Sequence, residues 1–321
     1  MYDLAFLINP VSGGGIGKNV FHRLGEILDS FGMERTVWTA ELTEPTRFVE
    51  QTDELLLSSR KLIAVGGDGT LAVVLDRVRH LKPATIIGLI PLGTGNDLSR
   101  VLGIYRVYGT KGLIACLKQL LKANSQPFDL WDVGGRATLV SYLSTGLDAS
   151  VLHAFDQARK QKRLRGGLLG NQLFYLYAFF SRCRYRLPEG AMARIETVNG
   201  IADVPLQGRR SFLIANINSY AAGAHPFPSS RFDDGILEVA VFSSLWKYAL
   251  MAAGSRLIPS LARLSPRYYT RRITLFLPPG TPVQLDGEDL TPLIAQNSEL
   301  TISFGTRVNL LDLRRSFYAL F

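Results

Sequence analysis

The stretch IAVGGDGTLAVVL, residues 63–75, decides the fold of the first half of the chain. It opens with a short apolar run, Ile63 to Val65, that is typical of a buried strand. A glycine-rich turn follows, and apolar residues then recur at helical spacing from Leu71 onward. A strand, a glycine turn and a helix start together present free backbone N–H groups and a positive helix end to a phosphate. Asp68 lies inside the turn, where a carboxylate beside phosphate needs a cation or a proton-transfer role.

Two further glycine turns follow predicted strands. The strand Leu4–Ile8 ends at NPVSGGGIGK (9–18), and the strand Thr85–Ile90 runs into PLGTGNDLSR (91–100). Strands and helices alternate, which predicts a parallel sheet with the turns at the C-terminal ends of its strands. None of the turns is a Walker A loop or a dinucleotide fingerprint. One glycine turn is as often a connector as a ligand site, but three at one sheet edge favour a ligand site.

The bulk composition limits the class of protein. With 321 residues, 47% of them hydrophobic and 20% charged, the chain is long enough for two domains and is not disordered. Its formal net charge of +9 favours an anionic partner, such as a nucleotide or an anionic membrane surface. Two cysteines, Cys116 and Cys183, form no zinc module and indicate a reducing compartment. The longest strongly apolar run, Leu173–Phe180, is far shorter than the roughly 20 residues that span a bilayer, so we expect a soluble or peripheral protein.

The second half of the chain changes character. Short β-rich runs predict a mostly antiparallel β domain, with a helix at Ala149–Arg159. The aromatic segment Gly166–Leu187 has two interpretations. An aromatic stripe is more often core, which favours a core helix, whereas flanking basic clusters favour a membrane-facing element. The predicted strands are Thr138–Leu143, Ala193–Val198, Ser211–Asn216, Ile236–Phe242, Arg272–Leu277, Thr281–Leu285 and Glu299–Phe304.

The stretch QLDGED, residues 284–289, carries a pair of carboxylates. Residues two apart on a strand face the same side, so Asp286 and Glu288 project together if the strand continues. Such a pair opposite a phosphate site suits removal of a proton from a hydroxyl acceptor. The alternative is a polar hairpin turn, because Asp-Gly is a common turn signal.

In order and spacing, the motifs resemble those of the diacylglycerol kinase catalytic-domain family, which includes sphingosine and ceramide kinases and soluble bacterial lipid kinases. They are NP and SG at 9–13, GGDGT at 66–70 and PLGTGND at 91–97. The resemblance implies an α/β nucleotide-binding domain with a parallel sheet, of the NAD kinase and diacylglycerol kinase type, over residues 1–133 plus 306–321. It further implies a mostly antiparallel β-sandwich domain for the lipid substrate over residues 134–305.

The same resemblance implies the site residues. Glu288 is expected to be the base, with Asp286 in reserve, and Asp68 is counted with them as catalytic. The residues implied around ATP are Asn9, Pro10, Ser12, Gly13, Thr39, Gly66, Gly67, Asp68, Gly69, Thr70, Thr94 and Asn96. The residues implied to hold Mg²⁺, largely through water, are Asp68, Asp97 and Asp129. A structural Mg²⁺ is implied at Asp234 with the backbone carbonyls of Arg231 and Ile236.

Two positions leave room for other interpretations. Asp132 competes with Asp129 as the third acidic position and is otherwise a solvated loop acid, but the spacing to Gly146 favours Asp129. The family usually has a glycine cluster where this chain has Ala222-Gly223-Ala224, which makes the shape of that loop less certain.

The function expected from these features is an ATP- and Mg²⁺-dependent lipid kinase that phosphorylates diacylglycerol to phosphatidic acid. The alternatives are another acceptor, such as a sphingoid base, ceramide or, more distantly, NAD, and a non-catalytic nucleotide- or lipid-binding regulator. We expect a lipid substrate at a membrane surface, no nucleic acid partner, and a cytoplasmic protein at the membrane periphery. The oligomeric state stays open, with a homodimer as one alternative.

Overall fold

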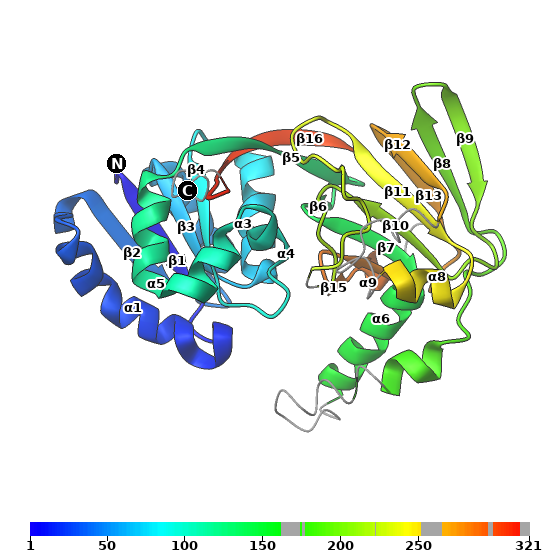
Figure 1. Cartoon of the computed structure of the whole chain (residues 1–321), viewed down its shortest axis with the longest axis horizontal. Coiled ribbons are helices and arrows are strands. Elements are labelled where there is room, and N and C mark those ends of the chain that lie inside the picture. Colours follow the sequence, from blue (N-terminus) through cyan, green and yellow to red (C-terminus); the bar gives the residue numbers. More distant parts are fainter. Residues whose placement is uncertain (162–173, 175–176, 222, 252–264, 295–297, 315–321) are drawn as a thin grey trace. The chain divides into compact units, whose positions relative to one another are not determined.

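The computed structural model describes the chain except for residues 162–173, 175–176, 222, 252–264, 295–297 and 315–321 (Figure 1). The chain divides into two compact units. The first unit comprises Met1–Leu130, Ala221–Gly223 and Gly305–Phe321, and the second comprises Trp131–Tyr220 and Ala224–Phe304. Two long strands, β5 (Ser125–Val133) and β16 (Glu299–Leu311), contribute residues to both units.

The first unit is built on a parallel sheet with the strand order β2-β1-β3-β4, and the last residues of β16 extend it beside β4. The strand β1 is buried at every position because helices cover the sheet. Helix α1 contacts β1, β2 and β3, whereas α2 and α3 contact each other and the sheet. Its elements in chain order are β1 (Leu4–Ile8), α1 (Ser12–Ser30), η1 (Arg35–Val37), β2 (Trp38–Leu42), α2 (Phe48–Ser58), β3 (Lys61–Gly66), α3 (Asp68–Leu81), β4 (Ile86–Pro91), α4 (Asp97–Val101) and α5 (Ile104–Lys122).

The strand order places a reversal between β1 and β3. From β1 the chain moves to β2 on one side and then returns to add β3 and β4 on the other side. In open α/β sheets, ligands bind beyond the C-terminal ends of the strands at such a reversal. The first two glycine turns follow β1 and β3, so both lie at this point.

The second unit contains a six-stranded antiparallel sheet with the order β12-β11-β10-β7-β14-β15, and the antiparallel strands β16-β13-β8-β9. In Figure 1, α6 lies below the six-stranded sheet and α8 beside it. The predicted fold class, an α/β unit with a parallel sheet followed by a mostly antiparallel β unit, is confirmed. The elements are β6 (Ala137–Leu139), β7 (Tyr142–Gly146), α6 (Leu147–Lys160), β8 (Met192–Thr197), β9 (Gly200–Pro205), β10 (Ser211–Ala215), β11 (Leu237–Phe242), α8 (Leu245–Ala249), β12 (Arg267–Thr270), β13 (Arg272–Phe276), β14 (Val283–Leu285), β15 (Glu288–Asp289) and α9 (Thr291–Ile294).

Two apolar cores cover the two faces of the six-stranded sheet. Along β10, Phe212 and Ile214 join a core shared with β8, β13 and β16. The alternate residues Leu213 and Ala215 join a second core that includes α6, Tyr220 and Tyr248. Because successive side chains on a strand point to opposite faces, burial of both faces requires a continuous apolar run. All five positions of β10 are buried, as this argument requires.

Several predicted element bounds are wrong. The run Thr138–Leu143 is not one strand, because the chain passes from β6 to β7 within it. The strands β9 and β12 were not predicted, since their residues are mostly exposed or half-buried and show weak alternation. Within the aromatic segment 166–187, residues 166–173 and 175–176 lie outside the described residues. Within the part that is described, Ala178 is buried in the second core while Tyr177 and Phe180 are exposed, which suits each interpretation in part.

The turns after β3 and β4 touch through their backbones. A methyl group placed on Gly93 would lie 2.6 Å from the Cα atom of Gly67, and one placed on Gly67 would lie 3.1 Å from the Cα atom of Gly93. Backbone atoms cannot swing aside as a flexible side chain can. Both positions therefore require glycine for the two turns to approach each other.

We predict that Gly93→Ala lowers the free energy of unfolding by about 1–3 kcal/mol, because the added methyl group forces the two turns apart. Gly109→Ala is the matched control. Gly109 lies within α5 and nothing lies within 4 Å of the added methyl group. The control should therefore gain about 0.5–1 kcal/mol from helix propensity. Urea unfolding of both variants checks the pair, and equal midpoints for Gly93→Ala and the wild type would contradict the close contact.

Candidate active site

The three glycine turns meet at the C-terminal edge of the parallel sheet in the first unit. A hydrogen bond from one turn reaches the next in each case, so the turns form one continuous surface. The bonds run from Asn9 Nδ2 to Thr70 Oγ1 (3.1 Å), from the Leu92 N–H to the Gly66 carbonyl (2.7 Å) and from the Asn96 N–H to Asp68 Oδ2 (2.6 Å). The structure thus brings together the predicted nucleotide-binding residues of all three motifs.

The first turn is not helical over its three glycines. Although α1 begins at Ser12, Gly13, Gly14 and Gly15 have φ values of 63°, 68° and 97°, which are left-handed and not helical. Glycine adopts this backbone without steric cost, whereas other residues rarely do. The Gly15 N–H donates to the Val11 carbonyl at 3.3 Å, and successive N–H groups in such a segment can form a concave site for an anion.

Asn96 shapes the third turn with its own side chain. Its φ is 53°, and its amide oxygen accepts from the Gly93 N–H (3.1 Å) while its amide nitrogen donates to the Gly93 carbonyl (2.5 Å). The side chain is buried and its hydrogen-bonding groups are used within the turn. Asn96 therefore acts on the turn's shape, while the exposed Thr94 at its tip is free to face a ligand.

Asp68 and Asp97 place two carboxylates close together. A methyl group on Gly95 would lie 2.8 Å from Asp68 Oδ2 and 3.8 Å from Asp97 Oδ2, so both carboxylates surround this glycine. Asp97 is buried, and it accepts from the Gly223 N–H at 3.1 Å. Burial and the Asp97 charge raise the pKa of Asp68 to about 6. Two such closely placed carboxylates are a natural place for a hydrated Mg²⁺, which prefers few carboxylates and keeps several waters.

Asp129, the third predicted metal residue, already has a cationic partner. It is 1% exposed, and its Oδ1 lies 2.5 Å from Arg307 Nε. Among the residues that the structure describes, no group of three His, Cys, Asp or Glu side chains is arranged to bind a metal ion directly. A direct three-carboxylate site is thus absent from the described part, and a water-mediated role for Asp129 stays a prediction. Asp132 accepts from the Gly135 N–H (2.9 Å) and closes the turn between β5 and β6.

Thr39 is not at the edge where the turns meet. It pairs with Ala5 in the middle of the sheet, three positions before the end of β1, or about 10 Å from the edge. There it lines a cavity of about 380 Å³ with Phe21, His22 and Arg35, among others. The resemblance implies Thr39 near ATP, and that role stays a prediction, because β2 continues from Trp38 to Leu42 beyond it.

Thr43, which was not predicted for the site, lies nearer to the edge of the sheet than Thr39. It follows the last residue of β2 directly, and its N–H donates to the Ile8 carbonyl (2.9 Å), next to Asn9. Pro45, two residues further on, is the sequence signal that the strand ends close to here.

The predicted structural Mg²⁺ site is a turn held by its own aspartate. Asp234 is exposed, and its Oδ1 accepts from the Ile236 N–H at 3.0 Å. Arg231 pairs with Asp233, with Nε and Oδ1 3.1 Å apart. The three residues are therefore close in the chain and share one turn, and their role toward a cation stays a prediction.

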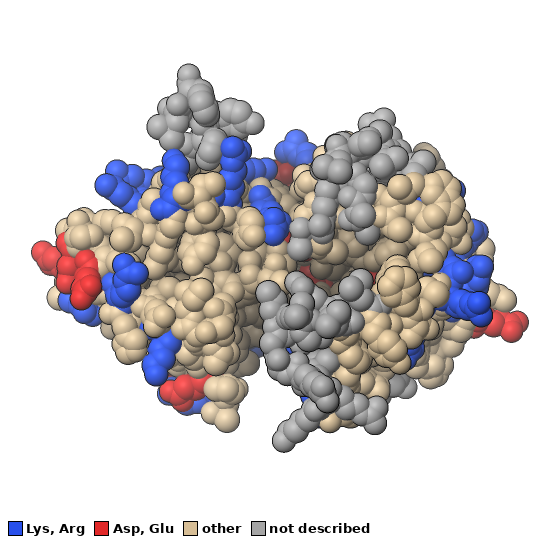
Figure 2. Space-filling view, turned by 60° about the horizontal axis from the view of Figure 1, so that its bottom comes forward, with Lys and Arg blue, Asp and Glu red and all other residues tan. Residues whose placement is uncertain are grey.

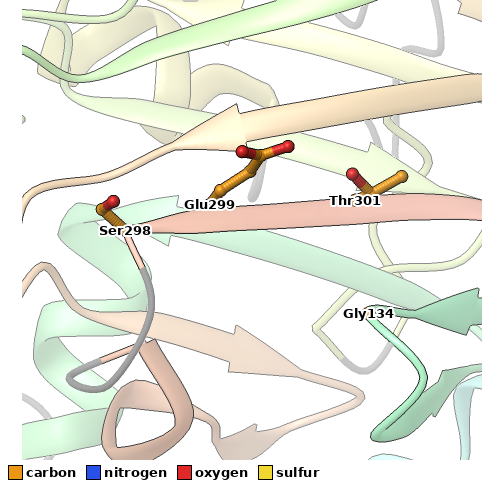
Figure 3. Close-up of a pocket in the computed structure, with 4 residues that line it drawn as sticks. All are labelled: Gly134, Ser298, Glu299 and Thr301. Carbon is orange, nitrogen blue, oxygen red and sulfur yellow. The ribbon is translucent and has the colours of Figure 1, made fainter.

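A second cavity, of about 330 Å³, lies in the second unit and is lined by Gly134, Ser298, Glu299 and Thr301. Figure 3 shows Glu299 and Thr301 on the same strand with Gly134 on a separate loop. None of these residues was predicted for the site, and the cavity is open.

The two carboxylates of QLDGED do not project together. β14 ends at Leu285 and β15 begins at Glu288, and these two residues pair across the hairpin. Asp286 and Gly287 form its two-residue turn, with φ values of 51° and 87°, as in a type I′ turn. The expectation of a continuing strand is wrong, and the hairpin alternative describes what the structure has.

The turn gives the two carboxylates different tasks. The Asp286 carboxylate accepts three backbone N–H groups, those of Val140 (2.9 Å), Ser141 (2.7 Å) and Tyr142 (2.9 Å). Glu288 is exposed, and partial burial together with the nearby Asp156 charge raises its pKa above the usual value. Asp286 is thus committed to holding the chain, whereas Glu288 is available to take a proton.

Comparison with protein families gives two adjacent matches. The diacylglycerol kinase catalytic domain matches residues 3–133, and the diacylglycerol kinase accessory domain matches residues 138–289. The chain is 27% identical over 325 residues to diacylglycerol kinase zeta of Homo sapiens, covering 90% of this chain and 33% of that protein. It is 27% identical over 351 residues to diacylglycerol kinase 2 of Arabidopsis thaliana, covering 96% of this chain and 46% of that protein. The chain therefore spans between a third and a half of the length of these relatives.

A solved structure has the same fold. The crystal structure of a diacylglycerol kinase from Bacillus anthracis str. Sterne superposes with a TM-score of 0.68, covers 98% of both chains and is 19% identical. At this identity the likeness concerns the fold.

The raised pKa of Asp68 predicts a stability that depends on pH. The unfolded chain ionises this group near 3.8 and the folded chain only near 6, so the fold loses stability as the pH rises through this interval. The loss is about 1–3 kcal/mol after allowance for solvent screening. Asp68→Asn lacks this group, so its stability relative to the wild type should improve by the larger part of that amount between pH 4.5 and pH 7.5. Urea unfolding at both pH values measures this, and a difference that does not change with pH would contradict the carboxylate pair.

The hairpin predicts opposite results for its two carboxylates. Asp286→Asn keeps a residue that tolerates a positive φ but loses the negative charge that three N–H groups face, so it should lose about 1–3 kcal/mol of stability. Glu288→Gln should change stability by less than about 0.5 kcal/mol, because its side chain is exposed. Thermal unfolding of the two variants compares them directly. Equal losses would mean that Glu288 also holds the structure.

Proposed function

Because this chain belongs to the diacylglycerol kinase family, we propose that it is an ATP- and Mg²⁺-dependent lipid kinase that phosphorylates diacylglycerol to phosphatidic acid. The observation that supports this most directly is the joined set of three glycine turns beside the Asp68–Asp97 pair. Phosphoryl transfer requires mainly positioning and charge stabilisation, and the turns offer both through backbone N–H groups.

The residues proposed to bind ATP lie on the turns. Asn9 fixes the first turn through its own side chain, because its Oδ1 accepts from the Val11 N–H (3.1 Å) while its Nδ2 reaches Thr70. Thr43 is added to Thr39 in this set, since it lies at the edge of the sheet. Mg²⁺, when bound, would neutralise phosphate charge, and Asp68 and Asp97 are the carboxylates whose closeness fits it.

Glu288 is the proposed general base toward the lipid hydroxyl. A general base works best when its pKa lies near the working pH, and partial burial together with the Asp156 charge moves the pKa of Glu288 in that direction. Asp286 supports this role by fixing the hairpin turn, in place of acting as a second base.

The lipid acceptor is proposed to be reached at an anionic membrane surface. Lys and Arg side chains are dispersed over the face shown in Figure 2 and are not gathered in one tail. The exposed aromatic residues Tyr177 and Phe180 are followed by Arg182, Arg184 and Arg186, a combination that suits a lipid interface. Within the described residues, no helix has both the length and the apolar character needed to cross a bilayer.

The test is transfer of labelled γ-phosphate from ATP and Mg²⁺ to mixed micelles of diacylglycerol, ceramide or sphingosine. We expect label on diacylglycerol, and a loss of about 10²- to 10⁴-fold in kcat for Glu288→Gln, as for removal of a general base. Asp68→Asn should lose activity as well and should bind Mg²⁺ less tightly, which the Mg²⁺-dependent rise in melting temperature measures without turnover.

Other outcomes change the assignment in defined ways. Label on ceramide or sphingosine keeps the mechanism and changes the acceptor. ATP binding without labelling of any lipid would contradict a lipid kinase and support a nucleotide-binding regulator. Full activity of a folded Glu288→Gln variant would remove Glu288 from the role of base.

A further inference from the structure

Helix α6 holds the hairpin β14–β15 at two points. The Asp148 carboxylate accepts from Gln284 Nε2 at 3.1 Å, and His153 Nδ1 lies 2.8 Å from Asp289 Oδ2. Gln284 and Asp289 are partners in the register of the hairpin, and the next pair is Leu285 with Glu288. Helix α6 therefore hydrogen-bonds to both Gln284 and Asp289, the pair next to Leu285 and Glu288.

The first contact, made by Asp148, is held by several hydrogen bonds. Besides Gln284, the Asp148 carboxylate accepts from the hydroxyl groups of Ser144, Ser211 (2.8 Å) and Tyr220 (2.6 Å). These partners come from β7, β10 and the loop after it, so the N-terminal end of α6 is fixed to the middle of the six-stranded sheet. The residues that follow on α6, among them His153 and Asp156, are thereby held in place relative to the hairpin.

The second contact, made by His153, involves both nitrogens of its imidazole. His153 Nδ1 faces Asp289, and His153 Nε2 lies 2.9 Å from Gln157 Nε2. Because the Gln157 amide nitrogen is a donor, this arrangement assigns the proton to Nδ1, which donates to Asp289. The Asp289 side chain is only 3% exposed. Although burial alone would raise the pKa of Asp289, hydrogen bonds from Thr291 and His153 lower it.

The face of α6 that carries His153 also carries the charges around Glu288. Asp156 and Arg159 follow His153 at intervals of three residues, which places the three side chains along one side of the helix. Asp156 and Arg159 pair with each other at 3.1 Å, and both act on Glu288, Asp156 unfavourably and Arg159 favourably toward its charged form. The charges of α6 that act on Glu288 are thus those of Asp156 and Arg159.

We propose that His153 is a positioning residue: by holding Asp289 it fixes where the adjoining Glu288 carboxylate lies and which charges surround it. The proposal rests on the function proposed above, in which Glu288 takes the proton of the lipid hydroxyl. His153 acts through Asp289 and the hairpin, without contact with the reacting atoms. Loss of the bond leaves a buried carboxylate without one of its donors, which favours a displaced hairpin.

Two substitutions separate this role from simple packing. Asn at position 153 carries an amide nitrogen that reaches the position of Nδ1 and keeps the bond to Asp289, whereas Leu keeps the size and loses the bond. We expect His153→Leu to lower kcat about 10- to 100-fold with the KM for ATP unchanged, because displacement by about 1 Å costs this much. His153→Asn should retain kcat within about threefold of the wild type, and Asp289→Asn should lose activity as His153→Leu does.

A second readout needs no turnover. Carboxyl ¹³C NMR of labelled glutamate, with the Glu288 signal assigned by its disappearance in Glu288→Gln, follows the titration of Glu288 in each variant. We expect the midpoint to fall toward the usual value in His153→Leu and Asp289→Asn and to stay in place in His153→Asn. His80→Leu is the control, because it removes a histidine that lies on α3 with its Nδ1 2.8 Å from the Asp76 carbonyl.

The two readouts keep the two proposals apart. An unchanged midpoint and an unchanged kcat in folded His153→Leu overturn the positioning role, as does a loss in His153→Asn equal to that in His153→Leu. If the Glu288 midpoint moves in His153→Leu but the wild-type protein labels no lipid, the positioning role is supported and the proposed function is contradicted. If His153→Leu does not fold, Asp289→Asn decides by the same two measurements.

Discussion

The close backbone contact between Gly67 and Gly93 is the constraint on which the candidate site depends. It lets the turns after β3 and β4 lie against each other, so that Asp68 from one turn can accept from the Asn96 N–H of the other. That bond in turn places Asp68 beside Asp97. Two residues without side chains therefore create the closeness of two residues whose side chains carry charge. The backbone geometry comes first and the chemistry follows from it.

The carboxylate pair is unfavourable for the fold by itself. Burial and mutual repulsion both oppose ionisation of Asp68, so the protein is less stable at neutral pH than the same fold with a neutral residue there. Structures hold such pairs where a bound cation offsets the repulsion or where a proton is moved. The hairpin in the second unit shows the opposite arrangement, since the Asp286 charge is matched by three N–H donors and stabilises the chain.

The three glycine turns could be predicted from the sequence because alternating strands and helices force parallel strands to end at one edge. The limits of the prediction arise where one local signal has two physical meanings. Asp-Gly in QLDGED is both a turn signal and part of a carboxylate motif, and only the pairing of Leu285 with Glu288 decides between them. Thr39 lies within β2 and Thr43 directly after it, and only the observed end of the strand at Leu42 tells which of the two lies nearer the edge. The bonds from Asp148 to Ser211 and from His153 to Asp289 join residues more than 60 positions apart, which no spacing rule reveals.

The path of β16 has a consequence for how the chain folds during synthesis. Its early residues pair with β13, while Leu310 pairs with Ile87 of β4, and the buried Leu310 and Leu311 complete the sheet of the first unit beside that strand. Until these residues leave the ribosome, β4 lacks its outer neighbour, although every other strand of the parallel sheet has been made some 200 residues earlier. An unpaired apolar edge is a template for wrong partners. The parallel sheet of the first unit is thus synthesised early and completed late, and its edge at β4 lacks this neighbour until Leu310 has been added.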